Sequence, residues 1–143
     1  MIQKYKIEEA IPILHDCGIT KIAVEHDHMV FTFVHELYQH EAIQQIHPGA
    51  KSLIMSFHLT RLAKEEEYRL YVRKAGKRRE SYKRIKKETL MDLPKGKHSL
   101  QYLYHYVGAR ERILHLCTDQ NYVLYICADE VEFNWIESQQ YIV

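Results

Sequence analysis

The residues most suggestive of metal chemistry are His35 and Glu36, in the stretch VHELYQHEAI at residues 34–43. The zinc-protease motif H-E-x-x-H places its two histidines four positions apart, on one face of a helix. Here the second histidine is His40, five positions after the first, and about 100° per residue puts the two roughly 140° apart. One ion cannot bind both from a regular helix, so the stretch is interpreted as a helix that packs on the core.

His26 and His28 form a better metal-binding pair, because side chains two apart on a strand point to the same side. A catalytic zinc site also needs a third protein ligand and an open position. His15, His58 and Glu25 are available, but nothing in the sequence places them nearby. We interpret residues 26–28 as a solvated turn, keep His26 and His28 as the fallback metal ligands, and predict no metal and no cofactor.

Cysteine catalysis requires a thiolate with a base within hydrogen-bond reach. His15 and Cys17 are two residues apart, as are His115 and Cys117, and both pairs have apolar neighbours typical of a core. The three cysteines include no C-x-x-C pair, and an odd number does not suit a secreted disulfide framework. Reduced, buried thiols in the cytoplasm are the interpretation that this pattern favours.

Other catalytic signatures are absent from the sequence. The five glycines are too far apart for a dinucleotide-binding or phosphate-binding loop, and no G-x-S-x-G motif occurs. The acidic residues Asp129, Glu130 and Glu132 are interpreted as solvated charges near a strand end. We therefore predict a non-enzymatic binding protein. An enzyme whose site assembles only in the fold ranks third among the functions considered.

The most strongly charged stretch is RKAGKRRESYKRIKK, residues 73–87, in which nine of 15 residues are basic and only Glu80 is acidic. Concentrated positive charge attracts polyanions, and nucleic-acid binding uses it to neutralise phosphates. The predicted nucleic-acid or anion-binding residues are Arg73, Lys74, Lys77, Arg78, Arg79, Tyr82, Lys83, Arg84, Lys86 and Lys87.

Tyrosines lie beside this basic segment. Tyr71 precedes it and Tyr82 lies within it, and aromatic rings next to a basic groove stack on unpaired bases. If residues 98–107 form a strand, Tyr102, Tyr104 and Tyr106 share one face and extend such a platform. The competing interpretation is a solvated basic hairpin whose lysines protect an edge strand from aggregation, with tyrosines that fill the core.

The uneven distribution of charge supports an alternative function. Residues 61–96 contain 13 basic and 6 acidic residues, whereas the rest of the chain contains 7 basic and 13 acidic residues. Segments of opposite sign can dock on a charged partner or on a second copy of the chain. The alternative prediction is a protein-interaction module, a regulator or inhibitor that recognises an acidic protein surface or forms a homo-oligomer.

Apolar periodicity predicts the elements. The predicted helices are 7–17, which Pro12 makes awkward, and 35–47. The predicted strands are two within 21–34 joined by the turn 26–28, then 52–60, 67–73, 112–117, 122–127 and 131–136. Residues 77–91 favour a strand that returns along 67–73, and 98–107 suit either type.

These elements predict one domain over residues 1–143. Short links between strands require antiparallel pairing, so the expected fold is α+β, with about six to seven strands and two or three helices packed on one face. An all-β sandwich is the alternative. Glu8 and Glu9 interrupt any signal sequence, and no apolar run approaches the roughly 20 residues that span a bilayer, so we expect a cytoplasmic protein without a membrane partner.

Overall fold

The computed structural model describes residues 2–60, 68–73, 82–95, 100–108, 113–119 and 122–137 of the chain. Over these residues the molecule consists mainly of antiparallel strands, and its helices are short. The predicted α+β arrangement, with two or three helices on one face of a sheet, is therefore wrong. The all-β sandwich is nearer in class, but the strands close into a barrel instead of forming two packed sheets.

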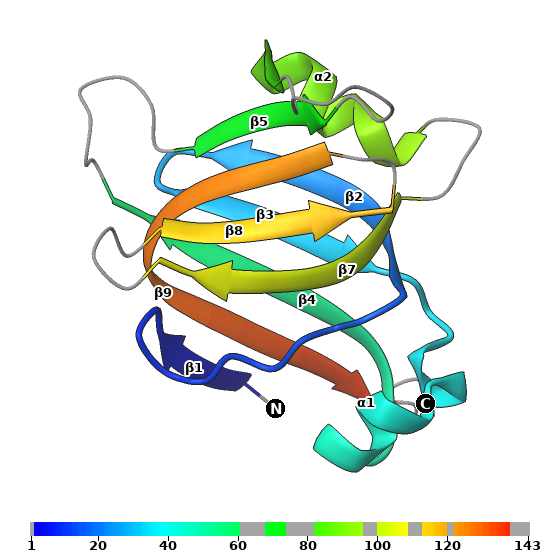
Figure 1. Ribbon diagram of the computed structural model, residues 1–143. Coiled ribbons are helices and arrows are strands. Elements are labelled where there is room, and N and C mark those ends of the chain that lie inside the picture. The colour runs from blue at the N-terminus through cyan, green and yellow to red at the C-terminus, as the bar shows by residue number, and fades with distance from the viewer. Residues whose placement is uncertain are drawn as a thin grey trace.

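Two meanders of three strands each form the barrel (Figure 1). The first comprises β2 (Cys17–Glu25), β3 (His28–Phe33) and β4 (Ala50–Leu59), and the second comprises β7 (Leu100–Val107), β8 (Ile113–Thr118) and β9 (Tyr122–Glu137). Pairing of β4 with β9 and of β2 with β7 joins the two meanders on both sides. The sheet thus closes on itself, which satisfies the backbone hydrogen bonds that open edges would leave unpaired.

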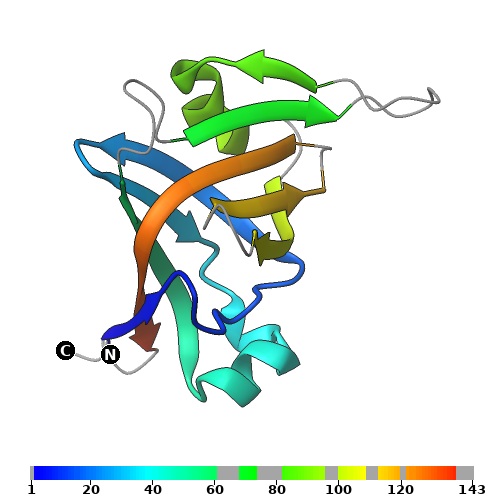
Figure 2. The ribbon, with the colours of Figure 1, turned by 60° about the vertical axis from the view of Figure 1, so that its left-hand side comes forward.

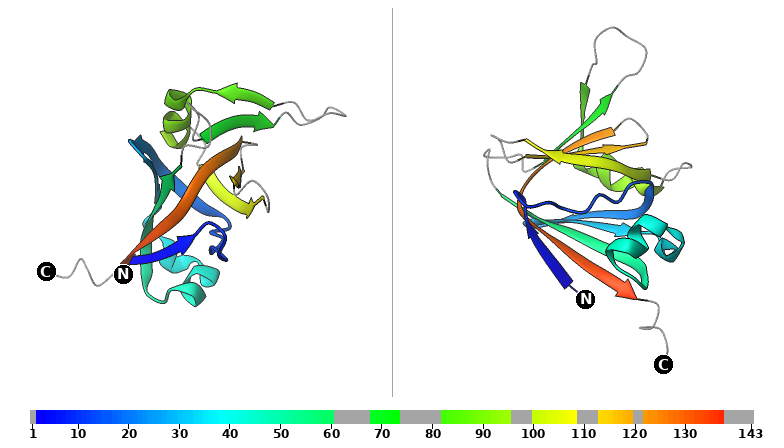
Figure 3. Two further views of the ribbon diagram at one scale, coloured as in Figure 1. Left: turned by 90° about the vertical axis from the view of Figure 1, so that its left-hand side faces the viewer. Right: turned by 60° about the horizontal axis from the view of Figure 1, so that its bottom comes forward.

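β9 is the longest strand, with 16 residues, and its two halves have different partners. Residues 123–127 pair with β8, and residues 128–137 pair with β4. Figure 3 shows β9, in orange to red, as one continuous curved strand. The sequence predicted two strands here, 122–127 and 131–136. The structure joins them through an irregularity in the β4–β9 register between His58 and Leu59.

Three further strands extend the sheet beyond the barrel. β1 (Ile2–Lys6) pairs with the second half of β9, whereas β5 (Tyr68–Arg73) pairs with the first half. β6 (Tyr82–Ile85) pairs with β5, and Figure 2 shows this hairpin at the opposite end of the molecule from β1. The described residues thus contain nine strands in one sheet, more than the six to seven predicted.

The helices lie at the two ends of the barrel (Figure 1). The 3-10 helix η1 (Leu37–Gln39) and α1 (Glu41–Ile46) lie at one end, and α2 (Lys87–Asp92) and η2 (Leu93–Lys95) lie at the other. Buried side chains anchor the helices at each end of the barrel: Leu37 and Ile43 at the first end, and Leu90 at the second. The predicted helix 35–47 is thus two short helical pieces. The predicted strand 77–91 is wrong from Lys87 onward, where α2 begins.

The predicted helix at 7–17 does not form. Ile7, Ile11, Leu14 and Cys17 are buried as their spacing suggested, but the chain is irregular until β2 begins. Its backbone bonds lead to the barrel: the Ile7 amide donates to the Asp129 carbonyl at 2.9 Å, and the Asp16 amide donates to the Tyr102 carbonyl at 2.7 Å. An extended segment that lies against strands buries the same residues without helical hydrogen bonds.

The inside of the barrel holds the aromatic core. Alternate residues of β4 point inward, and the predicted buried face of Leu53, Met55, Phe57 and Leu59 is confirmed. The largest fully buried side chains are Trp135, Tyr102, Phe31, Phe33, Phe57 and Phe133. Because inward residues alternate with outward ones, the polar positions between them form the outer surface of the barrel.

Candidate interaction surface

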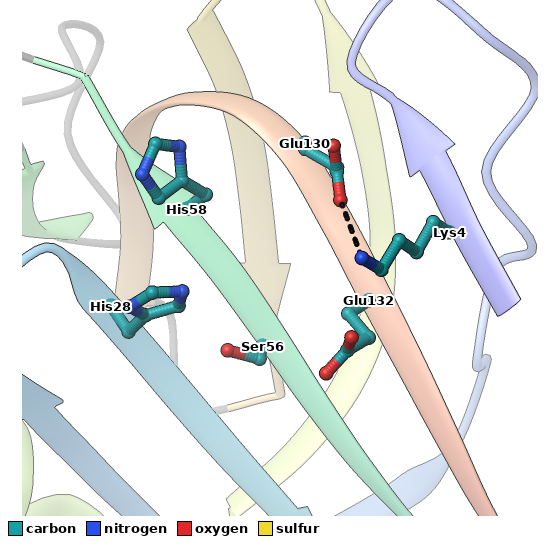
Figure 4. Close-up of a pocket in the computed structure, with 6 residues that line it drawn as sticks. All are labelled: Lys4, His28, Ser56, His58, Glu130 and Glu132. Carbon is teal, nitrogen blue, oxygen red and sulfur yellow. Dashed lines mark ion pairs between the residues drawn. The ribbon is translucent and has the colours of Figure 1, made fainter. Parts of the chain in front are cut away.

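Four strands present polar side chains side by side on the outside of the barrel. His28 of β3 is opposite His58 of β4, which is opposite Glu130 of β9. In the next row, Ser56 is opposite Glu132, which is opposite Lys4 of β1. Figure 4 shows the hollow that these side chains line, which has a volume of about 260 Å³; its lining residues are Lys4, His28, Ser56, His58, Glu130 and Glu132. With Asp27 and Asp129 at its rim, we name this surface the acidic groove.

His58 forms the centre of the hydrogen bonding in the acidic groove. Its Nδ1 lies 2.7 Å from Asp129 Oδ1, and its Nε2 lies 3.2 Å from Asp27 Oδ2. A carboxylate only accepts hydrogen bonds, so both ring nitrogens act as donors when both contacts form. The geometry therefore favours an imidazolium that connects the β2–β3 turn with β9.

Neighbouring charges shift the pKa values of this cluster. The hydrogen bond that His58 donates to Asp129 is the main cause that raises the pKa of His58, and Asp27 adds to it. The pKa of Asp27 is lowered, first by its hydrogen bond with His28, whose Nδ1 lies 2.7 Å from Asp27 Oδ1. All three side chains are about half exposed, at 43% for His58, 57% for Asp27 and 48% for His28, so solvent screens these interactions.

The β9 irregularity places Asp129 next to His58. In the β4–β9 register, His58 pairs with Glu130 while Leu59 pairs with Ala128, so Asp129 is an extra residue on β9. Such a bulge redirects a side chain locally, and here both Asp129 and Glu130 remain accessible to solvent. Glu130 Oε1 lies 3.9 Å from Lys4 Nζ, which links β1 to the same surface.

The groove does not have the geometry of a serine-type catalytic site. Ser56 is two residues from His58 on the same strand, but both nitrogens of His58 face carboxylates. No ring nitrogen is left to accept a proton from a nucleophile, which general-base catalysis requires. What the arrangement offers is exposed carboxylates held in place by hydrogen bonds.

The structure separates the two fallback metal ligands. His26 lies in the tight β2–β3 turn with φ 50°, whereas His28 begins β3 beside His58, with ring centroids 5.3 Å apart. Among the residues that the structure describes, no group of three or more His, Cys, Asp or Glu side chains is arranged to hold a metal ion.

Of the two predicted pairs, His15 and Cys17 have surroundings that do not suit cysteine catalysis. Cys17 is fully buried, and burial raises the pKa of its thiol to about 11. The thiol donates to the His15 carbonyl oxygen, with sulfur and oxygen 3.7 Å apart, while the His15 ring nitrogen Nδ1 lies 2.7 Å from the Leu103 carbonyl oxygen. A thiol with a raised pKa beside a histidine that faces elsewhere is a poor nucleophile.

The predicted basic segment lies only partly within the described residues. Arg73 ends β5, and Tyr82, Lys83 and Arg84 belong to β6. Lys86 and Lys87 lie at the start of α2 and are exposed. The remaining predicted binding residues, Lys74, Lys77, Arg78 and Arg79, lie outside the part of the chain that the structure describes.

The three tyrosines of residues 98–107 do not share one face. The segment from Leu100 to Val107 is a strand, but Tyr102 is fully buried and its hydroxyl hydrogen-bonds His105 Nδ1. A register shift between Tyr102 and Tyr104 separates it from Tyr104 and Tyr106, which are 45% and 52% exposed. Only these last two remain available for a surface platform.

Sequence reasoning missed the groove because its members come from four strands. A signal was present: Lys4 and Lys6, Ser56 and His58, and Glu130 and Glu132 are each two residues apart, which is the spacing of an outer strand face. The sequence does not show which strands are adjacent, so these pairs could not be combined into one surface.

Within the described residues, no helix is long and apolar enough to cross a membrane. The chain matches no family model, no curated protein and no solved structure.

Proposed function

We propose that this chain is a protein-interaction module whose acidic groove docks a basic segment of a partner protein. The observation that carries the proposal is the convergence of four carboxylates, Asp27, Asp129, Glu130 and Glu132, on one hollowed outer surface. Lys6 is opposite Glu130 in the β1–β9 register, so the cations among them are Lys4, Lys6 and the His58 imidazolium, and the four carboxylates still outnumber them. The surface therefore favours the lysine and arginine side chains of a partner.

The rigidity of the groove supports docking. Its residues lie on paired strands and at a tight turn, and hydrogen bonds from His58 and His28 hold two of the carboxylates. A preorganised surface loses little conformational entropy when it binds. Complementary charge mainly raises the association rate and the specificity, so the expected complexes form quickly and weaken with salt.

The test is the affinity of a fluorescently labelled peptide rich in lysine and arginine, measured by anisotropy at low and high salt. We expect the double variant Glu130→Gln and Glu132→Gln to raise the Kd at least threefold, because it removes two groove charges. The matched control is Glu36→Gln with Glu41→Gln, which changes the net charge equally at exposed positions near α1 and is expected to leave the Kd unchanged.

Equal loss of affinity in both double variants would contradict the proposal, because net charge and not the groove would then determine binding. A peptide in which each lysine and arginine is replaced by glutamate should not bind. The peptide is an unrelated sequence, so this assay does not depend on the basic segment 73–87 of the chain itself.

A further inference from the structure

A second outer surface of the barrel carries exposed aromatic rings. On β7, β8 and the first half of β9, Tyr106 is opposite His115, which is opposite Tyr125. The rings of Tyr106 and His115 are stacked, with centroids 4.5 Å apart and planes 8° apart, and the His115 and Tyr125 centroids are 4.4 Å apart. We name these three residues, with Tyr104, the aromatic ladder.

The sheet holds the aromatic ladder in place. Leu114 and Leu116 of β8 are buried in the barrel core, so His115 between them lies on the outer face. Tyr104 and Tyr106 are 45% and 52% exposed, although large apolar rings usually lose more of their surface in a folded domain. His115 covers one face of Tyr106, but about half of the surface of each tyrosine remains accessible on a rigid support, which favours a ligand that stacks.

Basic residues lie on the strands next to the ladder. β5 pairs with the edge of β9, where Arg69 is opposite Tyr125. On β6, Arg84 is opposite Tyr71 and so belongs to the same face as Arg69, whereas Lys83 belongs to the other face. Lys86 and Lys87, at the start of α2, are exposed. With strands about 4.8 Å apart, the four steps from β7 to β6 span on the order of 19 Å, a distance that a short polymer can cover.

At the other end of the ladder, a hollow of about 440 Å³ lies beside Tyr106. Its lining combines apolar side chains, such as Ile11 and Val107, with the acidic residues Glu8 and Glu9. Carboxylates repel phosphates, whereas the basic strands attract them. The two ends therefore differ in charge, and the end formed by β5 and β6 is the one that suits phosphate.

We propose that the aromatic ladder, together with β5 and β6, is a binding surface for single-stranded nucleic acid. Bases stack on Tyr104 and Tyr106, and phosphates lie near the basic strands. A single strand fits this chemistry because its bases are unpaired and expose their faces, and one strand carries both stacking groups and negative charge. A duplex hides its base faces and matches only the charge. This surface differs from the acidic groove, so the inference goes beyond the proposed function and is tested separately.

The experiment measures the Kd of labelled single-stranded DNA of about 12 nucleotides by anisotropy, using the full chain. We expect Tyr106→Leu to raise the Kd about fivefold or more, because leucine keeps apolar bulk but cannot stack on a base. Tyr38→Leu is the matched control: Tyr38 is 54% exposed on η1, away from the ladder, and its variant should bind like the wild type.

An abasic oligonucleotide of the same length separates stacking from charge. We expect it to bind at least fivefold more weakly than the intact strand. The double variant Lys86→Gln and Lys87→Gln should weaken the binding of both oligonucleotides and reduce its salt dependence. Equal affinity for the intact and abasic strands, or a Tyr106→Leu variant that binds like the wild type, would overturn the proposal. So would no binding at low salt. These outcomes leave the peptide assay of the acidic groove unaffected, because that assay uses another ligand and other residues.

Discussion

His58 is the residue on which the acidic groove depends most. It contacts Asp27 in the β2–β3 turn and Asp129 in the β9 bulge, so one ring connects parts of the chain that are far apart in sequence. Deprotonation leaves the ring a single N–H, and only one of the two carboxylates then keeps a donor. The protonation of His58 therefore controls both the local charge and the link between these elements.

We expect a pH-dependent contribution of His58 to stability. Its pKa is raised in the folded state, so its contribution is complete below its ordinary pKa of about 6.5 and is lost as pH rises through the folded value. For an exposed pair the size is about 0.2–1 kcal/mol. The stability difference between the wild type and His58→Gln in urea should therefore shrink from pH 5.5 to pH 8.5.

The control is His35→Gln, which removes a histidine at an exposed position outside the groove and is measured over the same pH range. A His58→Gln difference that stays constant between these pH values would contradict the assigned role. The contribution of Asp27 to stability has the opposite pH dependence, because its pKa is lowered in the folded state. This contribution is present above the ordinary pKa of an aspartate and is lost as pH falls through the folded value.

For individual residues, the sequence indicated whether a side chain is charged and exposed, but not which other side chains it contacts. The spacing of His26 and His28 suggested a ligand pair, whereas Asp129 and Glu130 had the pattern of solvated charges. They are indeed solvent-accessible, but they lie together with His58. Proximity between β4 and β9 is a property of the fold, and no local pattern in either strand contains it.

At the scale of elements, local patterns predicted strands well and connections poorly. The hairpin at 26–28 is confirmed, with a two-residue turn in which His26 adopts the left-handed region without a glycine. The helix at 7–17 is wrong because burial at helical spacing is also satisfied by an irregular segment. The strands 122–127 and 131–136 are continuous because a bulge bends β9 without ending it.

Gly49 shows how a turn between elements depends on backbone conformation. Its φ is 85°, and an added Cβ would meet nothing within 4 Å, so any cost of a side chain comes from the backbone. We expect Gly49→Ala to lower the free energy of unfolding by about 1–2 kcal/mol. Gly49→Asn should cost less, because asparagine tolerates this region.

Urea unfolding of both variants checks this ordering. If Gly49→Ala is as stable as the wild type, or if asparagine costs more than alanine, the left-handed turn between α1 and β4 is not what constrains this position.

At the scale of the whole molecule, the fold class depended on two pairings that the sequence did not reveal. Joining β4 to β9 and β2 to β7 turns two meanders into a closed barrel, and each pairing connects distant parts of the chain. Most of the strands were predicted. Without the two closing pairings, however, these strands would form an open sheet, and an open sheet needs helices to cover one face. The barrel covers its own core, so the helices lie at its ends.

The distribution of charge over the whole chain raises a testable expectation of self-association. The segment 73–87, with nine basic residues, has the composition that the acidic groove of a second copy would bind. We expect light scattering at high protein concentration to show a larger mean mass at low salt than at high salt. A monomer at both salt concentrations would exclude a second copy as the partner and leave docking of other proteins as the function.

The most direct test of the central proposal is a two-dimensional NMR titration of the labelled full chain with the lysine-rich and arginine-rich peptide. We expect the largest backbone amide shifts at residues 27–28, 56–58 and 129–132 and at Lys4, and we expect them to disappear at high salt. Shifts that are spread evenly over all exposed acidic residues, or concentrated near α1, would contradict the acidic groove as the docking site.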